Sequence, residues 1–143
     1  MSTNSRIVGI VDDEVDITEL FHDALCRIAG ISIVPFNDPI IALKHFTSNK
    51  EEYVLVISDL RMPGLNGLDL LKKMKRINPY VRTILMTAYE VESYKELKKS
   101  VKEDIINKFI QKPITISGLC IEVNNQIHAY ELRWKEVRIR AEN

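Results

Sequence analysis

Short runs rich in apolar residues, unbroken at residues 7–11 and 53–57, alternate along the chain with longer segments in which apolar residues recur every three or four positions. The runs have the length and β-branched content of strands that are buried on both faces, and the periodic segments are typical of amphipathic helices. The predicted strands span residues 6–11, 31–36, 53–57, 81–86 and 109–111. The predicted helices span residues 15–28, 39–46, 68–77, 94–106 and 116–127.

Several helix ends carry local signals that support these boundaries. Gly30 stands just past the first periodic segment, where a glycine commonly ends a helix. Asp38 precedes Pro39, and this order is typical of an N-cap followed by the first helical residue. Thr115 is the expected N-cap of the last helix. Helices are therefore predicted to begin and end between the strands, without overlapping them.

The regular alternation of strand and helix predicts the fold class. Each crossover must return the chain in the same direction, which produces a parallel sheet with right-handed connections. We therefore predict an α/β domain with a doubly wound, five-stranded parallel sheet. In such sheets ligands bind beyond the carboxyl ends of the strands, near the point where the strand order reverses. Residues that follow each strand are the first candidates for function.

Composition narrows the range of functions. The chain has 143 residues, 45% of them apolar, which is the size of one globular domain with a substantial core. Its 20 basic and 20 acidic residues balance, so it lacks the charge of a dedicated binder of nucleic acid or anionic membranes. No apolar run approaches the ~20 residues of a membrane span, and no secretory signal is present, so we expect a cytoplasmic protein. Cys26 and Cys120 are interpreted as buried free thiols.

Polar residues with suitable chemistry stand at the ends of four predicted strands. They are Asp12, Asp13, Asp59, Thr87 and Lys112. At one sheet edge the three carboxylates would repel one another unless a proton, a cation or a fixed ammonium relieved the repulsion. Lys112 supplies an ammonium, and an all-oxygen group of carboxylates suits Mg²⁺, which readily shares its shell with a phosphate. The pattern predicts that Asp59 attacks a phosphorus atom and becomes an aspartyl phosphate.

Each of these residues also has an ordinary interpretation when taken alone. Asp12 and Asp13 could be an N-cap pair for the helix that follows them. Thr87 could be an ordinary strand-end threonine, and Lys112 an ordinary solvated charge. Their joint occurrence at the ends of neighbouring strands favours the shared site.

Four segments carry a resemblance to a known family. They are residues 11–14 (VDDE), 57–69 (ISDLRMPGLNGLD), 84–89 (ILMTAY) and 109–113 (FIQKP). In order and separation they resemble the receiver domain of two-component response regulators, a (βα)5 flavodoxin-like fold, over residues 6–129. The segment between Thr87 and Lys112 departs from that pattern because it is a few residues longer and lacks a small Ala-Gly-Ala-like turn.

The resemblance implies a role for each site residue. The implied metal ligands for Mg²⁺ are Asp12 (mostly through water), Asp13, Asp59 and the backbone carbonyl of Arg61. The implied residues of phosphoryl transfer are Asp59 as acceptor, Thr87 as switch hydroxyl and Lys112 as partner of the phosphoryl oxygens. Phe109 is the implied aromatic switch residue that follows Thr87, although a phenylalanine on a short strand is first of all a core residue. The Lys112–Pro113 peptide is expected to be cis.

The resemblance also implies a function and partners. The family takes its phosphoryl group from a histidine of a sensor kinase or phosphotransfer protein and switches a surface for a downstream protein. The balanced charge of this chain separately predicts no direct contact with nucleic acid. Such a domain is a signalling phosphoacceptor rather than an enzyme that turns over a substrate. One alternative is an interaction scaffold that does not need phosphorylation. Another is an aspartyl-phosphate phosphatase, which Glu14 disfavours because those enzymes carry an acid/base Asp two positions after the nucleophile.

The C-terminal end suggests an extension of the last helix. Beyond Ile127, apolar residues continue at helical spacing, at Tyr130, Trp134 and Val137. We therefore divide the chain into a flexible segment 1–5, a receiver domain 6–129 and a helical extension 130–143, and we expect a stand-alone receiver. A homodimer would form through the helix over 94–106, the strand over 109–111 and the last helix, or through the extension. The alternative for the extension is a frayed, partly helical end.

Overall fold

The computed structural model of the protein describes residues 6–88 and 94–142. Five parallel strands form one sheet in the order β2-β1-β3-β4-β5, which confirms the predicted α/β class. The strands are β1 (Ile7–Val11), β2 (Ser32–Phe36), β3 (Tyr53–Asp59), β4 (Arg82–Thr87) and β5 (Lys108–Gln111). Strand β2 is the next strand in the chain and lies on one side of β1. The chain then crosses to β3, which lies on the other side of β1. The strand order therefore reverses at β1 and β3.

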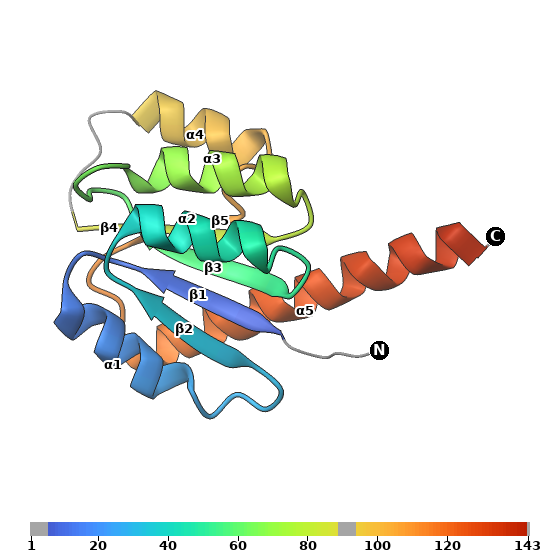
Figure 1. The fold of residues 1–143 in the computed structure, drawn as a ribbon, viewed down its shortest axis with the longest axis horizontal. Coiled ribbons are helices and arrows are strands. Elements are labelled where there is room, and N and C mark those ends of the chain that lie inside the picture. Colours follow the sequence, from blue (N-terminus) through green and yellow to red (C-terminus); the bar gives the residue numbers. More distant parts are fainter. Residues whose placement is uncertain (1–5, 89–93, 143) are drawn as a thin grey trace.

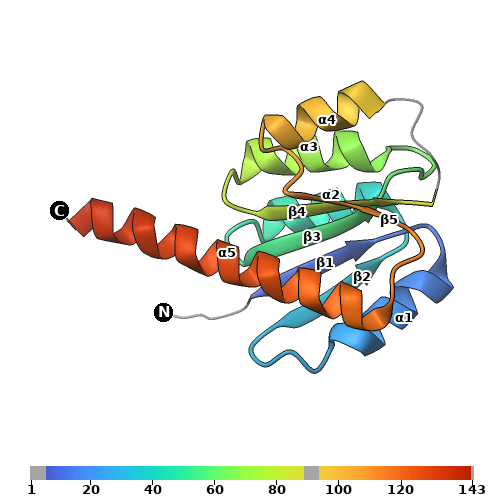
Figure 2. The same ribbon diagram turned by 180° about the vertical axis from the view of Figure 1, so that it is seen from behind.

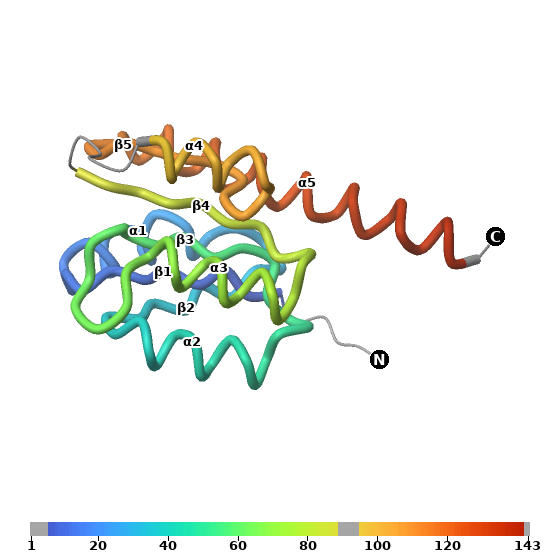
Figure 3. Tube along the Cα trace, turned by 90° about the horizontal axis from the view of Figure 1, so that it is seen from above, coloured from blue at the N-terminus to red at the C-terminus, as the bar shows by residue number. Residues whose placement is uncertain are grey.

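Helices cover both faces of the sheet, as Figures 1 and 2 show. The helices are α1 (Val15–Leu25), α2 (Pro39–Ser48), α3 (Gly67–Ile77), α4 (Tyr94–Lys102) and α5 (Ile116–Glu142). Buried residues of α2, α3 and α4 pack in one core cluster, and those of α1 and α5 pack in a second. The tube view in Figure 3 shows the same layers from above.

The alternation of side chains along each strand divides the core between these two clusters. Val11 belongs to the cluster under α2 and α3, whereas its neighbour Ile10 belongs to the cluster under α1 and α5. Every residue of β1 is buried, as the unbroken apolar run predicted. Burying apolar area on both faces contributes roughly 25 cal/mol per Å² and makes the centre of the sheet a rigid platform. The site described below stands on this platform.

Two helices end earlier than the sequence predicted. The apolar period of the first helix runs to Ile28, but α1 ends at Leu25 and a turn follows, with Gly30 at a φ of 75°. Similarly, Ile105 lies beyond α4, because Asp104 adopts a φ of 64° and both Ile105 and Ile106 donate their N–H groups to the carbonyl of Ser100. Apolar spacing alone does not reveal where a turn in the left-handed region interrupts a helix.

The interpretation of the cysteines as buried thiols was wrong in part. Both thiols are free, but Cys26 is exposed and Cys120 is half-buried. Cys26 follows the last residue of α1 and thus faces away from the core that Leu25 enters. Among residues 6–88 and 94–142, every helix is too short or too polar to cross a bilayer.

The last helix continues well past the sheet. It spans 27 residues, and Figure 1 shows its C-terminal half projecting away from the other elements. Two contacts hold the helix where this half begins. The ring of Trp134 meets that of Tyr80 edge-on, with 5.8 Å between the ring centroids, and Arg6 forms an ion pair with Glu131. The frayed end considered above is therefore not observed, and the predicted extension is helical.

Candidate functional site

The carboxyl ends of β1 and β3 meet where the strand order reverses. Val11 is the register partner of Ser58, so the residues that follow each of them lie side by side at this edge. Asp12 comes directly after β1, and Asp59 is the last residue of β3. This is the position at which open α/β sheets bind ligands, and the chain fills it with acids.

Three carboxylates gather at this edge. One oxygen from each of Asp12, Asp13 and Asp59 can be chosen so that all three lie within 4.8 Å of one another. Asp12 is buried, Asp59 is half-buried and Asp13 is exposed, so the group opens toward solvent on one side. An all-oxygen donor set with an open side fits a hard divalent cation that keeps part of its water shell, which is the preference of Mg²⁺.

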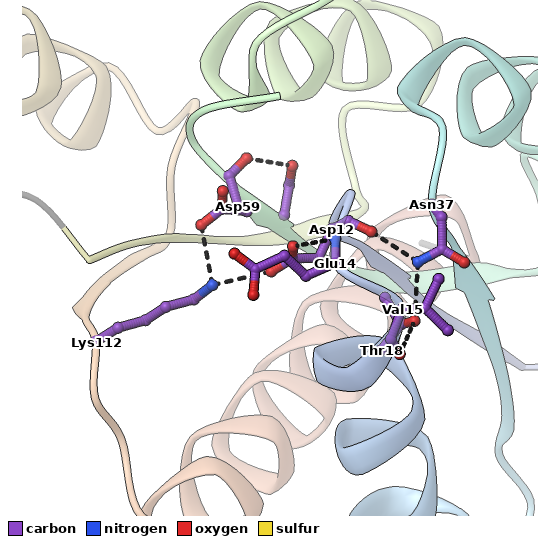
Figure 4. A network of polar contacts seen from close by, with 8 residues as sticks. Asp12, Glu14, Val15, Thr18, Asn37, Asp59 and Lys112 are labelled. Atoms are coloured by element: carbon purple, nitrogen blue, oxygen red, sulfur yellow. Dashed lines mark hydrogen bonds and ion pairs between the residues drawn. The ribbon is translucent and has the colours of Figure 1, made fainter. Parts of the chain in front are cut away.

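The ammonium of Lys112 bridges two of these acids (Figure 4). Its Nζ atom lies 2.9 Å from Oδ2 of Asp12 and 3.1 Å from Oδ1 of Asp59. The backbone supports this placement, because the Lys112 N–H donates to the carbonyl of Thr87 over 2.7 Å. The Lys112–Pro113 peptide is cis, as expected. The lysine thus holds one fixed positive charge between β1 and β3.

The electrostatics of the group are governed by burial and by this lysine. Burial raises the pKa of Asp59, and the hydrogen bond and charge of Lys112 only partly offset the effect, while the charges of Asp12 and Asp13 add to it. Burial opposes the charged form of Lys112, but hydrogen bonds to Asp12 and Asp59 outweigh burial and raise its pKa. Lys112 is therefore charged at neutral pH, and the acids retain excess negative charge that a cation can neutralise.

Backbone and side-chain hydrogen bonds fix Asp12. Its Oδ1 accepts from the N–H of Glu14 over 2.9 Å, and its carbonyl oxygen accepts from Nδ2 of Asn37 over 2.8 Å. Asn37 also donates to Thr18, which ties α1 to the end of β2 (Figure 4). Asn37 is not among the predicted site residues, although it follows a strand as they do. The N-cap of α1 is Glu14, without a side-chain cap, so neither Asp12 nor Asp13 stands at the N-cap position.

Two small residues shape the backbone around Asp59. Ser58 is fully buried, and its hydroxyl donates to the carbonyl of Asp59 over 2.9 Å. A Cβ atom at Gly67 would meet that same carbonyl oxygen at 2.0 Å, so only glycine allows α3 to begin this close to β3. In the sequence Gly67 resembles any turn glycine, because its close approach to β3 is a tertiary contact.

The remaining predicted site residues, Thr87, Phe109 and Arg61, differ in how far they are buried. Thr87 is buried at the end of β4, whose neighbouring residue Met86 is the register partner of Asp59. Phe109 is half-buried opposite Leu85 and packs on the core cluster under α4. Arg61 is exposed in the loop between β3 and α3, two residues after Asp59. Tyr89, the last residue of the third motif, lies outside the described residues, as do residues 1–5.

Comparison with known proteins identifies the family. The sequence profile of the response regulator receiver domain matches residues 8–124. The chain belongs to the response regulator receiver domain family. Sporulation initiation phosphotransferase F of Bacillus subtilis is 35% identical over 97 residues, which are 67% of this chain and 75% of that protein. The receiver domain fold and its phosphoacceptor role in two-component signalling therefore apply to this chain.

Longer relatives match this chain over only a part of their length. The DNA-binding transcriptional regulator NtrC of Escherichia coli K12 is 31% identical over 125 residues, covering 87% of this chain but 25% of that protein. The chain thus spans about a quarter of the length of the NtrC regulators that it matches.

Solved structures agree with the receiver fold. A response regulator receiver domain from Clostridium thermocellum superposes with a TM-score of 0.78 at 28% identity, covering 89% of this chain and 98% of that one. A structure described as adenylate cyclase from Rhodopirellula baltica gives a TM-score of 0.85 at 20% identity, covering 99% of this chain and 100% of that one. At that identity the second match supports the fold alone, and it extends along nearly all of α5.

Proposed function

We propose that Asp59 accepts a phosphoryl group from a phosphorylated histidine of a sensor kinase or phosphotransfer protein. The observation that carries this proposal is the bridge from Lys112 to Asp12 and Asp59, two of the three clustered carboxylates. A bridging ammonium beside a cation site offers positive charge on two sides of Asp59. This is the arrangement that an incoming phosphoryl group requires.

Asp12, Asp13, Asp59 and the backbone carbonyl of Arg61 would hold Mg²⁺ in this proposal. The donor chemistry supports the choice, since carboxylate and carbonyl oxygens suit a hard cation and the acids carry excess negative charge. When bound, the ion supplies positive charge for the oxygens of the transferring group. The residues of the chain do the remaining work.

The proposed transfer forms one bond and breaks one. A carboxylate oxygen of Asp59 bonds to the phosphorus atom, while the bond from phosphorus to the imidazole nitrogen of the donor breaks and the nitrogen keeps the electron pair. Lys112, already charged and next to Asp59, pairs with a phosphoryl oxygen. The hydroxyl of Thr87 donates a hydrogen bond to another phosphoryl oxygen. Phosphoryl transfer is the only chemistry proposed for the domain, which does not turn over a separate substrate.

Thr87 and Phe109 would then convey the change to a protein surface. Thr87 and Lys112 are joined through a backbone hydrogen bond at the end of β4 and β5. Phe109 packs against the core cluster that includes Leu97, the one apolar side chain of α4 that is buried among the described residues. A shift of Thr87 toward the phosphoryl group would thus alter how α4, β5 and α5 present themselves to a downstream protein.

The division of the chain into 1–5, a receiver domain 6–129 and an extension 130–143 remains our proposal, as does a cytoplasmic location. Exposed Leu132, Trp134 and Ile139 on the extension support a protein contact there. A homodimer would use either this extension or the surface of α4, β5 and α5.

The exposed residues of the extension favour a second function, a scaffold that binds a protein regardless of phosphorylation. Partner binding compared with and without a beryllofluoride mimic distinguishes the two.

A phosphorylation assay tests the proposed acceptor. The protein is incubated with Mg²⁺ and acetyl phosphate, and the intact mass is measured. We expect one added phosphoryl group on the native chain and on the control Asp23→Asn, an exposed carboxylate on α1, and none on Asp59→Asn. Equal labelling of Asp59→Asn would overturn the assignment, and so would labelling of the native chain that is unaffected by removal of Mg²⁺.

A further inference from the structure

A polar cavity lies between α3 and α4, away from the acidic edge. It has a volume of about 400 Å³ and is lined by four cations, Lys72, Lys75, Arg76 and Lys99, together with Glu96, Glu103, Ser100 and Ile105. The volume falls within the range of small-molecule pockets. None of its lining residues takes part in the site around Asp59, so the cavity needs its own explanation.

The acids in this groove compensate only two of the four cations. Lys72 lies 3.7 Å from Glu96, and Lys99 lies 3.8 Å from Glu103. Both contacts are long and reach solvent, with Lys99 76% exposed, so each contributes little stability. Among the described residues, neither Lys75 nor Arg76 has a carboxylate within ion-pair distance. The groove therefore holds a net excess of positive charge.

Lys75 lies deeper in the groove than the lysines at its rim. Its ammonium donates to Oδ1 of Asn107 over 2.9 Å, but that oxygen already accepts from the N–H of Thr83. The carboxylate of Asp104 accepts from Nδ2 of Asn107, and its charge also attracts Lys75, but less than burial opposes the charged form of the lysine. Burial lowers the pKa of Lys75 to about 8, which agrees with a cation that lacks a full partner. An anion entering the groove would relieve this cost.

We propose that the groove between α3 and α4 binds a small phosphate compound that carries at least two negative charges. Lys75 and Arg76 supply two cations that are not neutralised, at adjacent positions on α3, and the rim lysines add further donors. A phosphate group can accept from several of these donors at once, whereas a single carboxylate accepts fewer. The recessed place of Lys75 favours a small ligand over the flat surface of an acidic protein.

The experiment uses the full chain and pyrophosphate as the probe. Binding is followed by amide chemical shifts in EDTA at low salt, without any phosphodonor, so that the acidic edge cannot retain the probe through a metal ion. We expect saturable binding with shifts confined to α3, α4 and the turn that follows α4. Lys75→Met and Arg76→Gln should each weaken binding about tenfold or more, since each removes a charge-assisted hydrogen bond. The matched control Lys73→Gln, an exposed lysine on the same helix, should change binding less than about twofold.

Three outcomes would overturn the proposal. They are binding that does not saturate, losses in Lys73→Gln as large as those in Lys75→Met and Arg76→Gln, and shifts centred on Asp59. Failure with pyrophosphate but Lys75-dependent binding of a glutamate-rich peptide would assign the groove to an acidic protein instead. Because neither Mg²⁺ nor phosphorylation enters the measurement, a negative result leaves the proposed role of Asp59 unaffected.

Discussion

A Cβ atom at Gly67 would lie 2.0 Å from the carbonyl oxygen of Asp59, so the first residue of α3 packs directly against the last residue of β3. The N–H of Gly67 also donates to the carbonyl of Leu60 over 2.8 Å, which closes the intervening loop. Asp59 is thereby held by backbone contacts on the side that faces α3. Any side chain at position 67 must displace either the helix or the acceptor residue.

Replacing Gly67 with alanine should therefore destabilise the fold and disturb the acidic group. We expect a loss of about 2–3 kcal/mol in the free energy of unfolding, because the clash is with backbone and cannot be relieved by a rotamer change. Urea denaturation measures the loss, and Mg²⁺ titration reports the disturbance. Gly30→Ala is the control, since its φ of 75° disfavours alanine but no atom stands within 4 Å; it should lose about 1 kcal/mol and bind Mg²⁺ normally. Equal effects of the two variants would contradict the argument.

Lys112 is expected to stabilise the folded chain through the two acids that it bridges. Lys112→Met leaves Asp12 and Asp59 without their cation, and we expect a loss of roughly 3–5 kcal/mol at pH 7. Without the lysine the pKa of Asp59 rises further, so the loss should shrink as the pH falls and the carboxylates are protonated. Unfolding measured at pH 7 and pH 5 tests this trend. Added Mg²⁺ should restore part of the stability, and the exposed control Lys73→Met should show neither effect.

The raised pKa of Asp59 predicts competition between protons and Mg²⁺. Its carboxylate is protonated at a higher pH in the folded chain than in the unfolded one, so the ion must displace a proton in that range. Mg²⁺ affinity should be highest at neutral pH and should weaken steadily as the pH falls toward 4. Calorimetric titrations between pH 7.5 and pH 4.5 measure it. An affinity that stays constant over this range would show that Asp59 is not a ligand.

Asn37 should act on the metal site without touching it. Its side-chain amide donates to the carbonyl of Asp12 and to Thr18, so Asn37→Ala removes two hydrogen bonds that fix the turn after β1. We expect Mg²⁺ affinity to fall by about tenfold, the usual effect of losing a residue that orients a ligand. The control is Asn125→Ala, because Asn125 is exposed on α5 and its side chain donates to Glu122, away from the acidic edge. Comparable losses in both variants would count against a positioning role for Asn37.

Removing the charge of Lys75 should stabilise the folded chain, whereas removing that of Lys112 should destabilise it. Its pKa is lowered to about 8 from an ordinary 10.5, so the folded chain binds this proton more weakly than the unfolded chain does. Stability should therefore rise with pH between about 8 and 10.5, and Lys75→Met should be more stable than the native chain by about 1–3 kcal/mol at pH 7. Asn107 keeps its bond from Thr83 in that variant. A destabilised Lys75→Met would mean that packing of the lysine stem outweighs the burial of its charge.

The elements that could be predicted from the sequence are those whose signals are local. Short runs rich in apolar residues located all five strands, and the strand-end rule then indicated that Asp12, Asp59 and Lys112 belong together, because parallel strands end at one edge. Right-handed crossovers restrict the possible strand orders. The order itself, including the reversal at β1 and β3, is established by the structure.

The parts that the sequence did not reveal depend on tertiary contacts. Asn37 resembles any loop asparagine until β2 is placed beside β1, and Gly67 resembles any turn glycine until α3 is placed against β3. Lys75 belongs to a helix rich in lysine, where charges are usually solvated, and its burial depends on α4 lying across it. The early end of α1 has a similar origin, because the turn at Gly30 interrupts an apolar period that looks continuous.

Trp134 is the only tryptophan in the chain, and its ring meets Tyr80 at the point where α5 leaves the sheet. The contact therefore provides an intrinsic optical reporter at the base of a projecting rod. Any tilt of the projecting part of α5 that separates the two rings changes the surroundings of this single indole. The fluorescence of Trp134 therefore reports such a tilt without an attached dye.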